Sequence, residues 1–356
     1  MCIRDRAKLV AINGSGLAFP EVGLKPGVQH QGAFDELLRW LGGHNEDDWK
    51  ISAVGHRVVH GGELYSQPMV LTPEVLAELE QFIILAPLHQ PHNLAGIRAL
   101  SARLPLIPQI GCFDTAFHRT QPHVAQLFAL PRALSAEGIK RYGFHGLSYE
   151  YIASVLPEHS DKASGRVIVA HLGNGASMCA MVNRRSQATS MGFTAIDGLV
   201  MGTRSGALDP GVILYLLENK GLDVKQLTKL LYKESGLLGV SGLSQDMRTL
   251  LASSDAAAAE AVELFCYRAV IQIGSLAAAI GGIDALVFTG GIGEHAAEIR
   301  RRIVEGCRWL GLELDPEANS GQRIHIGTSS SRVDVMVIPT DEEWMIADHT
   351  QALLRQ

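Results

Sequence analysis

Two apolar runs separated by a small polar loop constrain the fold of this 356-residue chain more than any other feature. RVIVA (166–170) is followed by HLGNGAS (171–177) and then by MCAMV (178–182). Short apolar runs bounded by glycines are typical of buried strands, so the segment predicts a β-hairpin in the core. Either the loop is a simple turn, or its glycines let backbone N–H groups approach a ligand such as a phosphate.

Strand–turn–helix units occupy the C-terminal part of the chain. Residues 285–304 (ALVFTGGIGEHAAEIRRRIV) have the pattern of a strand, a glycine turn and a helix, and residues 333–354 repeat this plan with a polar turn. Two further strands are predicted within 51–62 and 104–113. Apolar spacing and capping residues predict helices over 32–43, 72–89, 209–221, 223–236 and 255–280. The mixture predicts an α/β protein with two lobes.

Composition limits the classes of protein that fit the chain. Hydrophobic residues make up 47% and charged residues 19%, which argues against disorder, and the net charge of -6 gives no reason to expect nucleic acid or a membrane as partner. The apolar stretch 269–283 is interrupted by Gln272 and Ser275, which favours a buried helix. Five scattered cysteines without a C-x-x-C pair, and no signal-peptide pattern, indicate a reduced cytoplasmic protein.

Two glycine-containing loops are candidates for binding phosphate groups. The chain has no G-x-x-x-x-G-K-[ST] motif, so a P-loop is excluded. In FTGGIGE, Gly290 and Gly291 allow a sharp turn after a strand, and Gly293 opens a helix whose free N–H groups favour an anion. Each loop alone is equally consistent with a tight turn. The presence of both loops, at 171–177 and in FTGGIGE, favours a nucleotide site.

Several charged residues stand in contexts that suit chemistry. Arg57 in GHRVVHGG and Arg204 in MGTRSG need anionic partners for their donors, either a substrate or a carboxylate in a structural ion pair. Asp114 follows an apolar strand, and His145 stands in RYGFHG, although a lone histidine is more commonly structural than catalytic. The acidic turn 341–343 either caps the next helix or binds a metal.

Eight stretches occur in a fixed order: GHRVVHGGE, FDTAFH, KRYGFHGLS, HLGNGAS, MGFTAIDGLVMGTRSG, SQDMR, FTGGIGE and PTDEEWMIA. In this order they resemble the signature stretches of the acetate kinases, and the resemblance covers the chain from about residue 35 to its end. It implies an actin-like, ribonuclease-H-like α/β fold with an active-site cleft between two lobes, and a homodimer. The implied division is an N-terminal lobe of residues 1–113 plus 345–356 and a nucleotide-binding and dimerisation lobe of residues 114–344.

The resemblance also implies roles for individual residues. Asp114, His145 and Arg204 are implied to be catalytic, and Glu342 to belong to a magnesium site, with manganese as an alternative. The substrate is implied to contact Arg57, Val59, Leu88, Phe144 and Ala195. ATP as co-substrate is implied to contact His171, Leu172, Gly173, Asn174, Gly175, Asp246, Met247, Arg248, Gly291, Ile292, Gly293, Glu294 and His295.

The implied reaction is reversible in-line transfer of the γ-phosphate of ATP to acetate, which gives acetyl phosphate and ADP. The acetate carboxylate is already ionised at pH 7, so a strong general base is not needed. Arginines and Mg²⁺ offset the repulsion between the two anions. Asp114 is therefore as well suited to organising magnesium or Arg204 as to moving a proton.

The chain departs from the family pattern at several places. The family's first strand carries N-S-G-S-S-S, of which AINGSG (11–16) is a weak echo, so we expect the opening strand and turn to be absent. Ala195 stands where the family usually has proline, and His295 where it frequently has asparagine. The alternatives to an acetate kinase are a propionate kinase and a truncated, inactive nucleotide-binding form.

Overall fold

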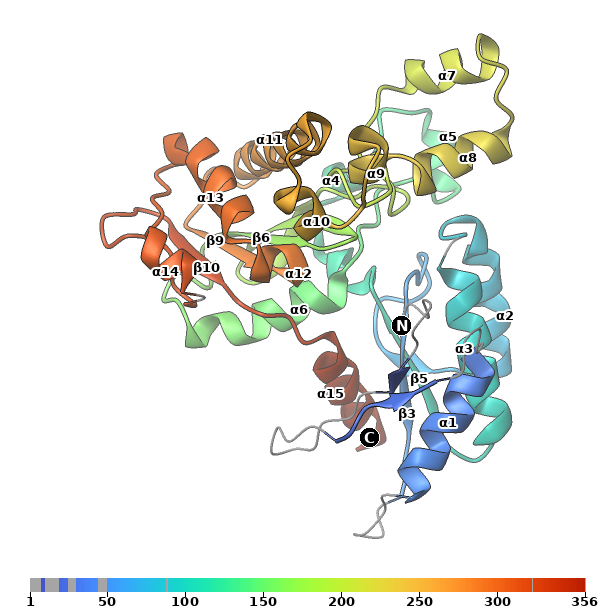
Figure 1. The fold of residues 1–356 in the computed structure, drawn as a ribbon. Helices are drawn as coiled ribbons and strands as arrows, with labels where there is room; N and C mark the ends of the chain where they lie inside the picture. The colour runs from blue at the N-terminus through green and yellow to red at the C-terminus, as the bar shows by residue number, and fades with distance from the viewer. Residues whose placement is uncertain are drawn as a thin grey trace.

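Two larger β-sheets organise the two lobes of the molecule, which a computed structural model describes for residues 8–9, 19–24, 30–43, 50–87, 89–321 and 323–355. Figure 1 shows one lobe around β3 and β5 and the other around β6, β9 and β10. The C-terminal helix α15 (Glu342–Leu354) packs on β3 and β5 of the first lobe and on α6 of the second. The predicted α/β fold with two lobes is confirmed.

The sheet of the larger lobe has the strand order β10-β9-β6-β7-β8. β6, β7 and β8 form an antiparallel meander, whereas β9 and β10 run parallel to β6. The predicted hairpin at 166–182 is therefore confirmed and lies at the centre of this sheet. The strands are β6 (Arg166–Leu172), β7 (Ala176–Val182), β8 (Arg185–Thr189), β9 (Ala285–Thr289) and β10 (Asp334–Val337).

Helices cover both faces of the larger sheet because its strands are apolar on both sides. Ile168 and Ala170 of β6 share a cluster with residues of α11 (Ala256–Ala279) and α13 (Ala297–Gly306). Val167 and Val169, which alternate with them, pack with α6 (Gly146–Val155) on the opposite face. Alternation along the strand thus explains why a continuous apolar run is buried.

Helix α11 is the one helix among the described residues that is long and apolar enough to cross a membrane. Its Val262, Phe265 and Ile273 side chains are instead buried against the sheet. Asp255 caps the helix by accepting a hydrogen bond from the N–H of Ala257 at 2.8 Å, so the predicted start of the helix is confirmed.

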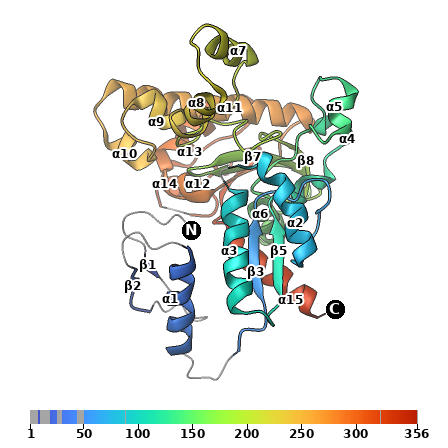
Figure 2. The same cartoon turned by 90° about the vertical axis from the view of Figure 1, so that its right-hand side faces the viewer.

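The sheet of the smaller lobe has the order β3-β5-β4, with β3 (Val54–Val58) parallel and β4 (Met69–Val70) antiparallel to β5 (Gln109–Phe113). One face packs on α2 (Pro73–Gln81) and α3 (Gln90–Arg103), and the other on α15 and α6. Figure 2 shows α3 and α2 beside β3 and β5 in the second view.

The predicted helix over 72–89 is shorter than expected. Thr72 caps it as predicted, by accepting from the N–H of Val75 at 3.4 Å, but the α-helix ends at Gln81 and continues as one 3-10 turn, Phe82–Ile84. Pro87 follows three residues later, and proline cannot continue a helix because it lacks an N–H group.

The other elements complete the two lobes. Figure 1 shows α7 and α8 standing away from the rest of the larger lobe. The remaining elements are β1 (Lys8–Leu9), β2 (Val22–Gly23), α1 (His30–Gly43), α4 (His123–Gln126), α5 (Arg132–Ala136), α7 (Pro210–Glu218), α8 (Val224–Lys233), α9 (Gly236–Ser241), α10 (Met247–Ala252), α12 (Gly290–His295) and α14 (Pro316–Ser320), with short 3-10 turns at Ala116–Thr120, Leu156–Glu158 and Arg308–Leu310.

Some predictions fall on residues that the structure does not describe. The stretch AINGSG (11–16) and Leu88 both lie outside the described residues. The division of the chain at residues 113 and 345 stays a prediction, although the two larger sheets fall on either side of it.

Candidate active site

An ion-pair cluster joins the two lobes at the ends of β3 and β5. Arg57 lies on β3, and Asp114 follows β5, whose backbone continues the parallel ladder because the N–H of Asp114 donates to the carbonyl of Val58 at 3.0 Å. Arg57 Nε donates to Asp114 Oδ2 at 2.9 Å, and its Nη2 contacts the same oxygen at 2.6 Å. Glu342, at the start of α15, contacts Arg57 Nε at 3.5 Å.

Burial perturbs the pKa of both carboxyl groups of this cluster, and the charge of Asp114 adds to the effect at Glu342. Burial raises the pKa of Asp114, while its pairing with Arg57 opposes the shift. Burial also raises the pKa of Glu342 to about 7, with Arg57 opposing and Asp114 adding to the rise. The side chain of Asp114 is 1% exposed, whereas that of Arg57 is 40% exposed. Arg57 is therefore anchored by Asp114 and still partly open to solvent.

His145 occupies a strained position between the two lobes. Its φ of 58° lies in the left-handed region, which non-glycine residues rarely adopt. It caps α6, and the N–H of the next residue, Gly146, donates to the carbonyl of Asp114 at 2.8 Å. His145 Nδ1 lies 2.8 Å from Ser177 Oγ. The ring stacks on that of His171, with centroids 4.4 Å apart, so the histidine from FHG meets the phosphate-loop candidate.

The histidines at this site are neutral at pH 7. Burial lowers the pKa of His145 well below its ordinary value, and the neighbouring His171, Arg57 and Arg204 lower it further. Burial likewise lowers the pKa of His171 to about 4. His89 has the same state, since burial and then Arg204 lower its pKa to about 4. The imidazoles therefore act as hydrogen-bonding groups, and the arginines carry the positive charge.

The loop 173–175 approaches Arg204 closely. A Cβ atom on Gly175 would lie 2.6 Å from Arg204 Nη2 and 3.3 Å from His145 Nε2, so any larger residue there would force the guanidinium of Arg204 to shift. Arg204 Nη1 donates to the carbonyl of Ala195 at 2.6 Å, and no ion pair of Arg204 is found in the described part of the chain. Burial lowers the pKa of Arg204 to about 10. Its charge is therefore left for a ligand anion.

Three of the predicted acyl-pocket residues belong to or pack against the same apolar cluster. Val59 and Phe144 are buried in the main apolar cluster, and Ala195 packs against that cluster. Because Arg204 bonds to the carbonyl of Ala195, this apolar surface lies next to an arginine. Such a pairing suits a small acid with one apolar group.

A cavity of about 610 Å³ opens beside the same loop. It contains most of the predicted nucleotide contacts, together with Gln245, Leu251 and Ala296, which the sequence did not single out. The predicted residues that line it are Gly173, Asn174, Asp246, Met247, Arg248, Gly291, Ile292 and His295.

Five predicted nucleotide residues do not line this cavity. Leu172 and Gly293 are buried in the protein. The Glu294 carboxylate turns back on its own helix, accepting from the N–H of Gly290 at 2.8 Å. His171 and Gly175 lie instead at the arginine side of the loop, as described above.

Sequence reasoning missed the residues that orient the histidines. Ser177 Oγ lies 2.8 Å from His145 Nδ1, and Ser148 Oγ lies 2.8 Å from His171 Nδ1. Both serines belong to motifs that were already singled out, HLGNGAS and FHGLS, so the motif carried the signal although the residue type did not. His89, beside both arginines, had no such signal.

The carboxylates of the cluster fit a magnesium ion that also binds the nucleotide. In the described part of the chain no group of three or more His, Cys, Asp or Glu side chains could hold a metal. Mg²⁺, however, is commonly held by one or two carboxylates plus substrate phosphates and water. Glu342 and Asp114 provide that number, and a pKa of about 7 for Glu342 marks a carboxylate that a cation would stabilise.

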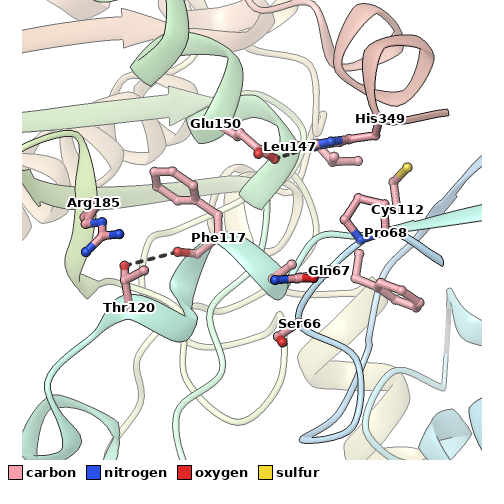
Figure 3. Close-up of a pocket in the computed structure, with 12 residues that line it drawn as sticks. Ser66, Gln67, Pro68, Cys112, Phe117, Thr120, Leu147, Glu150, Arg185 and His349 are labelled. Atoms are coloured by element: carbon pink, nitrogen blue, oxygen red, sulfur yellow. Dashed lines mark hydrogen bonds and ion pairs between the residues drawn. The ribbon is translucent and has the colours of Figure 1, made fainter. Parts of the chain in front are cut away.

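A second cavity, of about 310 Å³, lies between the lobes near α6 and α15. Figure 3 shows its lining, with Glu150 of α6 and His349 of α15 joined at one side. Their Nε2 and Oε2 atoms lie 3.0 Å apart. Since α15 packs on the smaller sheet, this ion pair connects the two lobes.

Anion-binding side chains beside a glycine-lined cavity, at the junction of two lobes, are the arrangement that a nucleotide-dependent phosphotransferase needs. The model of the acetokinase family matches residues 19–348, and the chain belongs to that family. The predicted family is therefore confirmed.

Known relatives extend this similarity over nearly the whole chain. An acetate kinase of Rhodopseudomonas palustris is 57% identical over 353 residues, which cover 98% of this chain and 88% of the relative. The crystal structure of Porphyromonas gingivalis acetate kinase is 39% identical, with a TM-score of 0.84 and coverage of 98% and 90%. A propionate kinase from Francisella tularensis has the same identity and coverage, with a TM-score of 0.89.

Proposed function

We propose that the chain transfers the γ-phosphate of ATP to acetate, reversibly and in line, to give acetyl phosphate and ADP. One observation carries the proposal. The loop 173–175 lines the nucleotide cavity through Gly173 and Asn174 and faces Arg204 through Gly175. A nucleotide seated in the cavity can therefore extend its phosphates along the loop towards Arg204. The 57% identity to a relative named acetate kinase supports acetate as the acceptor.

In this proposal the arginines and His145 stabilise the transferring group. The acetate carboxylate is the nucleophile and needs no base, so the main barrier is the repulsion between two anions. Arg57 and Arg204 offset that repulsion, and Arg204 is suited to the task because no carboxylate of the described residues neutralises it. Neutral His145, fixed by Ser177, donates through Nε2 to the phosphoryl oxygens when Nδ1 accepts from the serine.

Asp114 acts through Arg57 in this proposal. Its carboxylate holds Nε and Nη2 of Arg57 and so fixes the direction of the guanidinium. Because this carboxylate is 1% exposed and already paired, it is badly placed to exchange a proton with substrate. Asp114 is therefore assigned to positioning Arg57 rather than to proton transfer.

Glu342 and Asp114 would hold Mg²⁺, with Mn²⁺ as the alternative. When bound, the ion neutralises charge on the β- and γ-phosphates. Glu342 comes from the helix that packs on both lobes, so it reaches the nucleotide only in the folded two-lobed molecule.

The proposal includes a homodimer in the cytoplasm. Helix α7 has no buried residue, and Leu214 and Tyr215 are 57% and 52% exposed. Tyr267 and Ile271 of α11 are also exposed, and apolar surface of this kind indicates a protein interface. All cysteines of the described residues are free and buried, which supports a reducing compartment: Cys112, Cys179, Cys266 and Cys307.

The test is direct formation of acetyl phosphate by the purified chain from ATP, Mg²⁺ and acetate. We expect product with the unmodified chain and a loss of about 100- to 1000-fold in kcat/KM for Arg204→Ala, the range for removing one transition-state contact. Arg301→Ala is the matched control, because Arg301 is exposed and paired with Glu298 and Glu305. A chain that binds ATP but phosphorylates neither acetate nor propionate would contradict the proposal.

A further inference from the structure

Arg300 is among the largest fully buried side chains of the molecule, at 1% exposure. It lies on the inner face of α13, where its neighbours Ile299 and Ile303 are buried in the apolar core. No carboxylate of the described residues forms an ion pair with it. A buried cation without a counterion is costly, so a residue of this kind is expected to perform a task that an apolar side chain cannot.

The guanidinium of Arg300 donates hydrogen bonds to two short helices, α12 and α14. Nη1 donates to the carbonyls of Gly293 at 2.9 Å and Glu294 at 2.8 Å, both in α12. Nε donates to Asn319 Oδ1 at 2.7 Å, and Nη2 donates to the Asn319 carbonyl at 2.8 Å, in α14. The fork of donors therefore clamps α12 to α14 through α13.

Helix α12 depends on such outside contacts. It has six residues, of which Gly290, Gly291 and Gly293 are glycines. A helix this short is unstable by itself, and glycine weakens it further. The last carbonyl groups of a helix have no hydrogen-bond donors within it, and here Arg300 donates to those of Gly293 and Glu294. Its first N–H group, that of Gly290, is satisfied by Glu294 Oε1 at 2.8 Å.

Other residues of α12 line the proposed nucleotide cavity. Gly291, Ile292 and His295 all border it, and His295 directly follows the carbonyl of Glu294 that Arg300 holds. Displacing this carbonyl by a fraction of an ångström would move the cavity wall. We infer that Arg300 is a positioning residue for the nucleotide: it fixes α12 in the conformation that binds ATP, without contacting ATP itself. This inference rests on the proposed assignment of the cavity to the nucleotide.

A lysine cannot reproduce this arrangement. Its single ammonium group is a point donor, whereas the contacts of Arg300 require a planar fork that reaches α12 and α14 together. Arg300→Lys therefore keeps the charge and most of the volume while losing the clamp. Arg300→Met keeps the volume but removes all donors and leaves buried carbonyls unpaired, so it is expected to be less stable as well.

The experiment measures ATP binding by calorimetry, and KM for ATP and for acetate separately, in the unmodified chain and Arg300→Lys. We expect the dissociation constant and KM for ATP to rise about tenfold, equivalent to about 1.4 kcal/mol, while KM for acetate stays within about twofold. Arg301→Met on the same helix is the matched control and should change neither constant. Circular dichroism and thermal unfolding establish that each variant is folded.

The outcomes separate positioning from mere support of the fold. Partial unfolding lowers the active fraction, hence the apparent kcat, and leaves both KM values unchanged. Unchanged ATP affinity in folded Arg300→Lys would overturn the inference, as would equal rises in KM for ATP and acetate. If Arg300→Met fails to fold, Arg300→Lys alone decides. Because ATP binding is measured without turnover, a chain that lacks acetate kinase activity would refute the proposed function and still leave this test valid.

Discussion

At the scale of single residues, three of the proposed active-site side chains are each oriented by a second side chain. Asp114 holds Arg57, Ser177 holds His145, and Ser148 holds the ring of His171. Such supports matter because electrostatic stabilisation of a transition state requires donors that are in place before the charge develops. Arg204 differs from these residues, because its side chain donates to the backbone carbonyl of Ala195.

Replacing Arg57 should separate its proposed role in phosphoryl transfer from its structural role. We expect Arg57→Ala to lower kcat/KM about 100- to 1000-fold, the range for one lost transition-state contact. It also leaves Asp114 buried without its counterion, so the melting temperature should fall. The double variant Arg57→Ala/Asp114→Asn should recover stability but not activity. Near-normal kcat/KM in either variant would remove Arg57 from the site.

The acyl pocket should accept one additional methylene group. Ala195 is smaller than proline and packs against the apolar cluster that contains Val59 and Phe144. One methylene in an apolar pocket changes the transition-state energy by roughly 1–3 kcal/mol. We expect propionate to be used with a kcat/KM within about tenfold of that for acetate, measured side by side. A preference for acetate far beyond a hundredfold would mean that neighbouring side chains fill the space.

At the scale of elements, the loop between β6 and β7 lies between the proposed nucleotide cavity and Arg204. The loop approaches Arg204 closely at Gly175, where there is no side chain. A Cβ on Gly175 would lie 2.6 Å from Arg204 Nη2, whereas a Cβ on Gly42 of α1 would meet nothing within 4 Å. The two glycines therefore form a matched pair for substitution.

Gly175→Ala should reduce activity without unfolding the protein. Because Arg204 must shift to make room, we expect kcat/KM to fall at least about tenfold, in line with the sensitivity of catalysis to displacements near 1 Å. Gly42→Ala should leave kcat/KM unchanged, since alanine favours a helix. Steady-state kinetics with thermal unfolding as control tests this, and equal activity of the two variants would exclude the close approach.

At the scale of the whole molecule, the exposed helix α7 predicts a second subunit. Leu214 and Tyr215 lie on a helix without a buried residue, an arrangement that wastes apolar surface in a monomer. We expect Leu214→Glu/Tyr215→Glu to convert a dimer into a monomer in analytical ultracentrifugation. A replacement at Val224, on the adjacent helix, to lysine provides a comparison. An unmodified chain that sediments as a monomer at micromolar concentration would refute the dimer.

The ion pair between Glu150 and His349 should make stability depend on pH. Glu150 raises the pKa of His349, with Asp348 adding to the rise. Because the pKa of His349 is raised by folding, the stabilisation that the ion pair gives the folded state is fully present below about pH 6.5, the ordinary pKa of histidine. It is lost as the pH rises through the raised pKa. His349→Gln should therefore be less stable than the unmodified chain by about 1 kcal/mol at pH 5.5 and equal to it at pH 9.

Denaturant unfolding at the two pH values measures this difference. The expected stability difference is placed at the upper end of the range for exposed ion pairs because the side chains of His349 and Glu150 are only 19% and 35% exposed. A gap that widens towards pH 9 would have the wrong sign for this ion pair. Glu150→Gln should show the same pH dependence, since it removes the other partner.

The sequence by itself determined the elements whose signals are local. Short apolar runs and glycine punctuation sufficed for the hairpin at 166–182 and for the strand, turn and helix of 285–304, because these patterns involve residues close together in the chain. The helix over 72–89 was predicted too long, since a boundary depends on packing as well as on capping. The ordered motifs also indicated the family.

Only the tertiary structure decided how the site is assembled. The pairing of Arg57 with Asp114 comes from two parallel strands, and Glu342 reaches them from the last helix. Burial then set the protonation of His145 and Glu342. Arg300 carried no signal as one arginine in the run RRR, because what distinguishes it is that α13 turns it inward onto carbonyls of α12. Desolvation and hydrogen bonding between distant segments exist only once the chain has folded.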